Sequence, residues 1–108
     1  MTIYEFGRII LISFPYSDLR RVSKRPAAVL YDAGDKDVLV ARITTRSCLT
    51  ATDYKIDEWK QCGLNAASYI RLGKQATIEK QFVLKILGEL LEHEKNFLKT
   101  IPREMFRL

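Results

Sequence analysis

A run of basic residues is the densest chemical feature of the sequence. Four cations and one hydroxyl group lie between two apolar segments, in the order Arg20, Arg21, Val22, Ser23, Lys24 and Arg25. Lysine and arginine neutralise phosphate charge, and the planar guanidinium group of arginine matches two phosphate oxygens at once. Because Pro26 follows directly and begins an apolar segment, we expect a strand to position Arg25 and a loop to carry the rest of the run.

A second polar group follows a later apolar segment and consists of Arg42, Thr44, Thr45 and Arg46. Gly34 lies between the two segments, nine residues after Arg25 and ten residues before Thr44. If the segments pair as a hairpin around Gly34, Arg25 and Thr44 meet at its open end. A guanidinium group beside a hydroxyl group, with further cations nearby, makes a phosphate-sized pocket of hydrogen-bond donors.

Such a pocket suits the cleavage of RNA without a metal ion, because RNA carries its own nucleophile, the 2′-hydroxyl group. The protein must hold the phosphate in line and stabilise the charge on its oxygens. Arg25 and Thr44 suit these roles, but arginine stays protonated, so the residues alone assign no general base. A module that holds nucleic acid without cutting it would use the same cations.

A metal-dependent nuclease is the third hypothesis. The pattern of an acid followed by Glu-x-Lys is loosely matched by Asp53 or Asp37 with Glu58 and Lys60. That motif requires Glu-x-Lys on a strand, whereas this segment is polar and typical of a loop, and short motifs often arise by chance. We therefore expect neither a bound metal nor a cofactor.

Histidine, cysteine and tyrosine add little further chemistry. His93 is the single histidine, which excludes a histidine-rich metal site, and we expect it on the surface. Cys48 and Cys62 are too few for a zinc site or a disulfide scaffold, and they fit reduced thiols. Three tyrosines could stack on unpaired bases: Tyr16, Tyr54 and Tyr69. Packing is the commoner role of tyrosine in β proteins.

Length and charge narrow the class of protein. A chain of 108 residues predicts one domain, spanning residues 1–108. Eighteen basic and thirteen acidic residues give a net charge of +5, which favours a polyanionic partner such as nucleic acid. Wholly apolar runs reach only four or five residues, so we expect no membrane span, and the N-terminus does not look like a signal peptide. A cytoplasmic protein is the expectation.

The hydrophobic pattern predicts many short strands and one C-terminal helix. Strands are expected over residues 7–14, 27–31, 37–44, 53–56, 67–72, 75–78 and 83–90, the last of which could also be helical. The helix contains Phe97, Leu98 and Ile101, with acids near its start, and Pro102 should end or kink it. The expected fold is mainly β, a small and strongly bent barrel packed against the C-terminal helix, with an open α+β sheet as the alternative.

Three of these segments resemble the MazF/PemK toxins of bacterial toxin–antitoxin pairs: residues 7–19, 23–30 and 37–44. Shorter matches to the PemK-like branch follow at residues 57–59, 63–64, 68–72 and 87–90. The resemblance spans about residues 7–101 in the family's order and spacing. Its most specific part is the strand opening at Arg25 and Pro26.

The resemblance implies an SH3-like barrel, usually a homodimer, that acts as a metal-independent endoribonuclease on single-stranded RNA, including mRNA. The products would carry 2′,3′-cyclic phosphate and 5′-hydroxyl ends. It also implies a cognate antitoxin whose disordered tail covers the active groove, in a complex that often binds operator DNA.

The family's catalytic arginine and threonine fall on Arg25 and Thr44, and Ser23 matches a position that often lines the site. We assign RNA contacts to Arg20, Arg21, Ser23, Lys24, Arg42, Thr45 and Arg46. The chain departs from the family at Arg8, where an acid is usual, and in the short, basic loop before Arg25, which has no glycine. Loop shape bears on which RNA sequence is accepted.

Overall fold

The computed structural model describes residues 2–15, 22–47 and 50–106. The strands are β1 (Arg8–Pro15), β2 (Val22–Tyr31), β3 (Asp37–Thr44), β4 (Asp53–Lys55), β5 (Tyr69–Glu79) and β6 (Val83–Glu89). A 3-10 turn, η1 (Lys80–Phe82), leads into β6, and two short helices follow, α1 (Glu92–Leu98) and α2 (Ile101–Phe106). Within the described residues, no helix has the length and apolar character that crossing a membrane requires.

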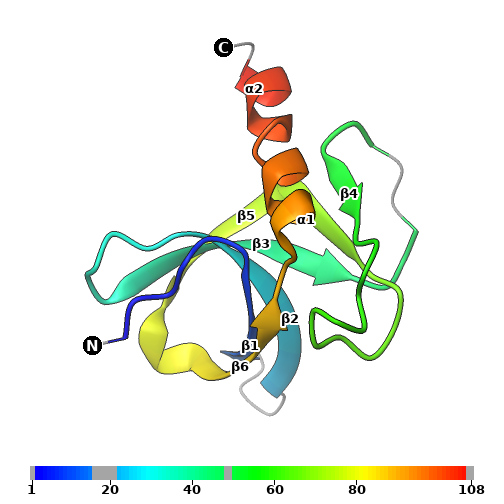
Figure 1. Ribbon diagram of the computed structural model, residues 1–108. Coiled ribbons are helices and arrows are strands. Elements are labelled where there is room, and N and C mark those ends of the chain that lie inside the picture. Colours follow the sequence, from blue (N-terminus) through cyan, green and yellow to red (C-terminus); the bar gives the residue numbers. More distant parts are fainter. Residues whose placement is uncertain (1, 16–21, 48–49, 107–108) are drawn as a thin grey trace.

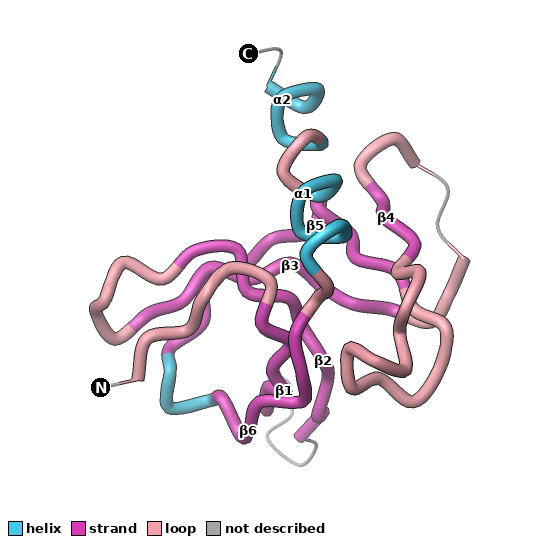
Figure 2. Tube along the Cα trace, in the orientation of Figure 1, coloured by secondary structure: helices cyan, strands magenta, loops and turns pink. Residues whose placement is uncertain are grey.

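The strands form one antiparallel sheet in the order β4-β5-β3-β2-β1-β6. Figure 1 shows the sheet curling around a ring, with the two helices standing on one side of it. Figure 2 shows that a long loop connects the short strand β4 to β5. The order ends at β4 and β6, so the sheet is barrel-like without being closed. This confirms the predicted mainly β fold with C-terminal helical structure.

Two apolar clusters cover the two faces of the sheet. Along β1, Ile9 belongs to the first cluster, whereas Ile10 and Ile12 belong to the second, and all three side chains are fully buried. The first cluster also contains Leu98 and Ile101, so it lies between the sheet and the helices. Because both faces of β1 are covered, its sequence is apolar without alternation.

The strand β2 begins earlier than the sequence predicts. Residues from Val22 to Lys24 were expected in a loop, but they pair with β1, which places Phe14 opposite Ser23. The same ladder continues with Ile12 opposite Arg25. Hydrophobicity gives no signal for this part of the strand, because its side chains include polar residues at the end of the barrel. The loop prediction for Val22–Lys24 is therefore wrong, whereas Arg25 lies on a strand as expected. Arg20 and Arg21 lie outside the described residues.

The strand β5 also differs from its prediction, because it runs through Gly73 where two separate strands were expected. Its pairing with β3 shifts at this point: Ala41 pairs with Gln75, and the next residue, Arg42, pairs with Arg71. The residues between the two partners form a bulge, which bends the strand without ending it. A glycine was read as a strand end, although inside a strand it often marks a bulge.

The last part of the chain forms two helices where one was expected. The ambiguous segment before them is the strand β6. Pro102 is the second residue of α2, where its missing N–H is one that the helix would leave unpaired anyway. The break comes earlier, near Thr100, whose hydroxyl donates to the carbonyl oxygen of Phe97 at 2.6 Å.

A close backbone crossing holds the turn around Gly63 against β6. A Cβ atom on Gly63 would lie 2.1 Å from the carbonyl oxygen of Leu87, and one on Gly88 would lie 2.0 Å from that of Cys62. Gly63 also has a φ of 89°, in the left-handed region. Only glycine fits at these two positions, so the crossing fixes where the turn lies.

The buried carboxylate of Glu94 joins α1 to the same region. It accepts hydrogen bonds from the hydroxyl of Tyr54 (2.8 Å), the backbone amide of Asp57 (2.7 Å) and the thiol of Cys62 (3.4 Å). Burial, together with these bonds to Glu94, raises the pKa of Cys62 to about 11 and raises that of Tyr54 well above its usual value. Tyr54 therefore has a structural role, and base stacking by Tyr54 is excluded because the side chain is buried.

We expect Glu94→Ala to lower the free energy of unfolding by roughly 3 kcal/mol or more, because it leaves several buried donors without an acceptor. Tyr54→Phe, which removes one hydrogen bond to a charged group, should cost about 1.5–3 kcal/mol. Urea denaturation at neutral pH measures both values. Glu92→Ala, on the exposed side of α1, is the control. Equal stability of Glu94→Ala and the control would contradict the structural role of the carboxylate.

Candidate functional site

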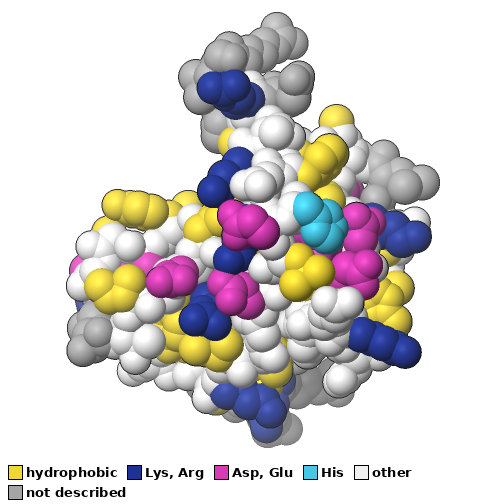
Figure 3. All heavy atoms as spheres, viewed as in Figure 1, with side chains coloured by type: hydrophobic (Ala, Val, Ile, Leu, Met, Phe, Trp, Pro, Cys, Tyr) yellow, Lys and Arg dark blue, Asp and Glu magenta, His cyan; other side chains and the backbone are white. Residues whose placement is uncertain are grey.

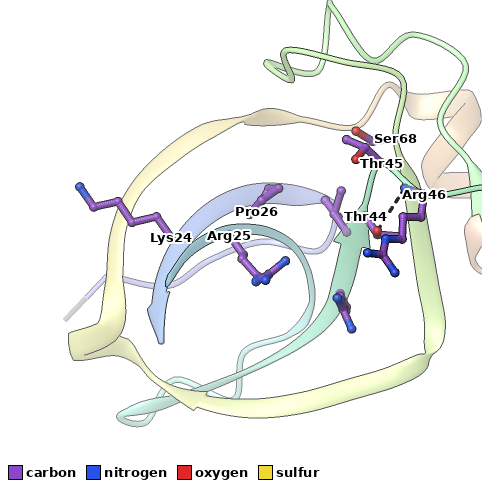
Figure 4. Close-up of a pocket in the computed structure, with 9 residues that line it drawn as sticks. Lys24, Arg25, Pro26, Thr44, Thr45, Arg46 and Ser68 are labelled. Carbon is purple, nitrogen blue, oxygen red and sulfur yellow. Dashed lines mark hydrogen bonds between the residues drawn. The ribbon is translucent and has the colours of Figure 1, made fainter. Parts of the chain in front are cut away.

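A hollow of about 350 Å³ lies where β2 and β3 separate. The ladder between these strands ends at the pair Ala27 and Arg42, so the residues beyond that pair form the walls of a fork. The lining residues are Lys24, Arg25, Pro26, Arg42, Ile43, Thr44, Thr45, Arg46 and Ser68. Figure 4 shows this pocket with the side chains that line it.

The fold of β3 explains why polar residues gather here. Val38 and Val40 are buried in the second core cluster. Arg42 and Thr44 continue the same face of the strand, because side chains alternate along it. The bulge in β5 lies between Val40 and Arg42 along this face, at the point where the sheet leaves the barrel. The face therefore changes from core to solvent within one strand and places both polar side chains at the mouth of the barrel.

Arg25 is held by the strand that the sequence predicted. It lies opposite the fully buried Ile12 on β1 and is followed by Pro26 in the pocket wall. In Figure 4 the Arg25 side chain extends toward the strand that carries Thr44, whereas Lys24 points in the opposite direction. The structure thus brings Arg25 and Thr44 to one pocket, as the hairpin around Gly34 predicts.

Thr44 is fixed by a local hydrogen bond at the end of β3. Its hydroxyl oxygen accepts from the backbone amide of Arg46 at 3.2 Å, which orders the turn after the strand (Figure 4). No described residue accepts the proton of the hydroxyl group. Thr44 can therefore offer a hydrogen bond to an anionic oxygen in the pocket.

The structure adds Ser68 to the pocket and does not place Ser23 there. Ser23 lies on β2 opposite Phe14 and is absent from the described lining residues. Ser68 is buried, and its hydroxyl donates to the carbonyl oxygen of Ala66 at 2.8 Å. A serine that follows two alanines carries no local signal of a site. Ser68 reaches the pocket because the residue after it, Tyr69, pairs with Thr44.

The charge around the pocket is positive. The cations that line it are Lys24, Arg25, Arg42 and Arg46, and the described lining residues include neither a carboxylate nor an imidazole. Acidic side chains gather instead around the single histidine and α1, on the face that Figure 3 shows. A small hollow with this excess of cations suits a phosphate or a chain of phosphates.

The carboxylates of the metal-nuclease alternative have other partners. Asp53 accepts hydrogen bonds from the backbone and hydroxyl of Thr50, at 3.1 and 2.8 Å, and from Arg71 at 3.3 Å. Burial opposes ionisation of Asp53, but these donors outweigh it and lower its pKa. Glu58 lies in a turn, whereas the motif requires this residue on a strand. Its carboxylate accepts a hydrogen bond from the side chain of Gln61.

Another group of possible metal ligands converges near α1. The ligand atoms of Asp57, His93 and Glu94 lie within 4.8 Å of one another in the described part of the chain. The oxygens of Glu94 are already occupied by the buried hydrogen bonds to Tyr54, Asp57 and Cys62. His93 is exposed, as expected, and its Nε2 atom lies 3.7 Å from the carboxylate of Asp57. This group is therefore an exposed contact between His93 and Asp57 beside a structural carboxylate.

Comparison with solved structures identifies the fold. The chain matches the Mycobacterium tuberculosis toxin MazF-mt6 with a TM-score of 0.77 and 25% identity, over 94% of this chain and 97% of that one. The chain has a MazF-like fold. Neither a family model nor a curated protein matches the sequence. The likeness therefore rests on structure and on the order of the segments described above.

More distant structures share the MazF-like fold. One is the MazE–MazF complex from Deinococcus radiodurans, with a TM-score of 0.80 and 11% identity over 100% of this chain and 99% of that one. Another is a mycobacterial endoribonuclease in complex with its cognate antitoxin, with a TM-score of 0.78 and 18% identity over 95% of this chain and 94% of that one. In this chain, Arg25 and Thr44, which the sequence resemblance matches to the family's catalytic residues, both line the pocket.

Asp53 should make the stability of the MazF-like chain depend on pH. Because its pKa is lowered on folding, its contribution is present above the unfolded value of about 3.9 and is lost as the pH falls through the lower folded value. Asp53→Asn should cost about 1–3 kcal/mol at pH 7, and the difference from the unmodified protein should shrink as the pH falls below about 4.

Urea denaturation over a series of pH values measures this difference. The matched control is Asp35→Asn in the exposed hairpin loop, which should change stability little at any of these pH values. A loss for Asp53→Asn that stays the same size from neutral to acidic pH would show that the carboxylate charge contributes nothing.

Proposed function

We propose that this chain is the toxin of a type II toxin–antitoxin system, an endoribonuclease that cuts single-stranded RNA without a metal ion. The observation that carries the proposal is the pocket in which Arg25 and Thr44 meet on a MazF-like fold. The endoribonuclease and toxin relatives of similar structure support the activity. The substrate would include mRNA, as the sequence resemblance implies.

The chemistry uses the substrate's own nucleophile. The 2′-hydroxyl group gives up its proton to solvent water, and its oxygen attacks the adjacent phosphorus as the bond to the 5′-oxygen breaks. A 2′,3′-cyclic phosphate forms, and the leaving oxygen takes up a proton from water as a 5′-hydroxyl. Negative charge grows on the two non-bridging oxygens during the attack. Arg25 would bind these oxygens with its guanidinium group, and Thr44 would donate its hydroxyl proton to one of them. Holding the phosphate in line supplies the rest of the effect.

A non-catalytic nucleic-acid-binding module is the second candidate function. One observation favours it: the described residues that line the pocket include no carboxylate or imidazole that could accept a proton near neutral pH. Charge alone suffices for binding, whereas cleavage requires the planar fork of arginine. Arg25→Lys therefore separates the two functions, because it keeps the charge and loses the fork.

The proposed toxin would have protein and nucleic-acid partners. Structures of similar fold include a MazE–MazF complex and an endoribonuclease with its cognate antitoxin, which supports an antitoxin as partner of this chain. The antitoxin tail would lie across the basic pocket and exclude RNA. We further propose a homodimer in the cytoplasm and, with the antitoxin bound, a complex that binds operator DNA.

The test uses purified protein and a long single-stranded RNA in excess EDTA. The unmodified protein should make discrete cuts with cyclic-phosphate ends. Arg25→Ala and Thr44→Val should each slow cleavage by about 10²–10³-fold, the usual effect of removing one donor to a developing oxyanion. Arg25→Lys should also abolish most cleavage while it keeps RNA binding within about threefold.

The matched control is Arg103→Ala, an exposed arginine on α2 outside the lining of the pocket, which should cut at the normal rate. Full activity of Arg25→Ala would overturn the assignment of the site. Salt-sensitive RNA binding without cuts would favour the binding module. Cuts that appear only when Mg²⁺ replaces EDTA would overturn the metal-independent mechanism.

A further inference from the structure

Polar side chains continue beyond the pocket across the sheet. Thr44 on β3 lies opposite Tyr69 on β5, and Tyr69 lies opposite Lys55 on β4. The residue before Thr44, the residue before Lys55 and the residue after Tyr69 all face the first core cluster: Ile43, Tyr54 and Ile70 are buried there. Because side chains alternate along a strand, Thr44, Tyr69 and Lys55 share the opposite face. We call these three residues the Tyr69 row.

Tyr69 lacks the contacts that usually explain a tyrosine in a sheet. Its side chain is half-buried, but it belongs to neither core cluster and is not among the partly buried side chains that pack against them. Within the described residues, its hydroxyl makes no hydrogen bond, and the aromatic pair, which is tilted, is Tyr54 with Phe97. Core packing therefore does not account for Tyr69.

Lys55 places a positive charge at the far end of the row. It is exposed on the edge strand β4 and forms no ion pair with the part of the chain that the structure describes. In the neighbouring row, Arg71 pairs with Asp53 at 3.3 Å, so its charge is offset. The Tyr69 row thus runs from the cationic pocket, past an aromatic ring, to a cation without an acidic partner.

The row spans two strand spacings. Neighbouring strands lie about 4.8 Å apart, so the backbones at Thr44 and Lys55 are separated by roughly 10 Å. Because the lysine side chain is flexible, the ammonium group of Lys55 can bind a phosphate that lies nearer to Thr44 or farther from it than this backbone separation. Single strands bind proteins through bases stacked on aromatic rings and phosphates held by cations. An acidic peptide would use the cations but would gain little from the ring between them.

We propose that Tyr69 and Lys55 form a nucleotide subsite beside the pocket of Arg25 and Thr44. Tyr69 stacks on the base next to the bound phosphate, and Lys55 binds the following phosphate of single-stranded RNA. The inference rests on the proposed function for the identity of the ligand. It requires RNA binding but not cleavage, so the two proposals can fail separately.

The test measures binding without cleavage. The probe is a fluorescein-labelled 2′-O-methyl RNA oligonucleotide of random sequence, which has no free 2′-hydroxyl nucleophile, in EDTA at several salt concentrations. Tyr69→Leu, which keeps apolar volume but removes the ring, should weaken binding about five- to a hundred-fold. Tyr69→Phe keeps the ring and should bind within about twofold of the unmodified protein.

Lys55→Ala should change the salt dependence of binding. Losing one phosphate contact should reduce the slope of log K against log salt by about 0.7, the value for one phosphate of a single strand. Lys85→Ala is the matched control, since Lys85 is an exposed lysine on β6, at the opposite edge of the sheet. It should leave the slope unchanged, as should Tyr69→Leu.

A direct contact is tested without any substitution. An oligonucleotide that carries 5-iodouridine should crosslink to Tyr69 on illumination, as mapped by mass spectrometry of the peptides. Unchanged affinity of a folded Tyr69→Leu protein, or crosslinks elsewhere only, would overturn the subsite and leave this face to a protein partner. If the probe binds as predicted but natural RNA is not cut, the subsite stands and the proposed catalysis fails. If the unmodified protein binds no oligonucleotide, both proposals fail.

Discussion

The buried carboxylate of Glu94 is the interaction on which the arrangement of this molecule depends. The strand β4 has three residues, too few to be stable by pairing alone, and its central residue Tyr54 donates to Glu94. The same carboxylate binds the start of the turn at Asp57 and the thiol of Cys62 near its end. One carboxylate on α1 thus holds three points of the stretch from Tyr54 to Cys62, which lies at least 32 residues away in the sequence. A charge buried in this way is stable only because its donors satisfy it.

The support that Glu94 gives to β4 extends through the sheet to the pocket. The strand β4 supports β5, and β5 supports the end of β3, where Thr44 lies. Without β4, this end of the sheet would be a two-stranded extension beyond the barrel, which is marginal in water. The helix α1 therefore contributes to the site without touching it. The close crossing of Gly63 with β6 adds a second fixed point to the same region.

The sequence predicts the strands that carry the site better than the ends of those strands. The segment 37–44 matches β3 at both ends, because Gly34 marks the hairpin and the apolar run is clear. The start of β2 was missed, since polar residues at the end of a barrel look like a loop. The bulge at Gly73 was missed as well, because one glycine signals a strand end and a bulge equally. Ser68 has no local signal and becomes visible only through the register of β3 with β5.

The pairing of Arg42 with Arg71 is the clearest sign that this face serves function before stability. Like charges directly opposite on neighbouring strands destabilise a sheet. Asp53 offsets the charge of Arg71 from the next strand, but Arg42 stays exposed at the pocket. A sequence selected for folding alone would place an acid or a neutral residue at position 42. Natural sequences depart from favourable local pairing mainly at functional sites. The unfavourable pair of Arg42 with Arg71 therefore supports a role for Arg42 in binding an anion.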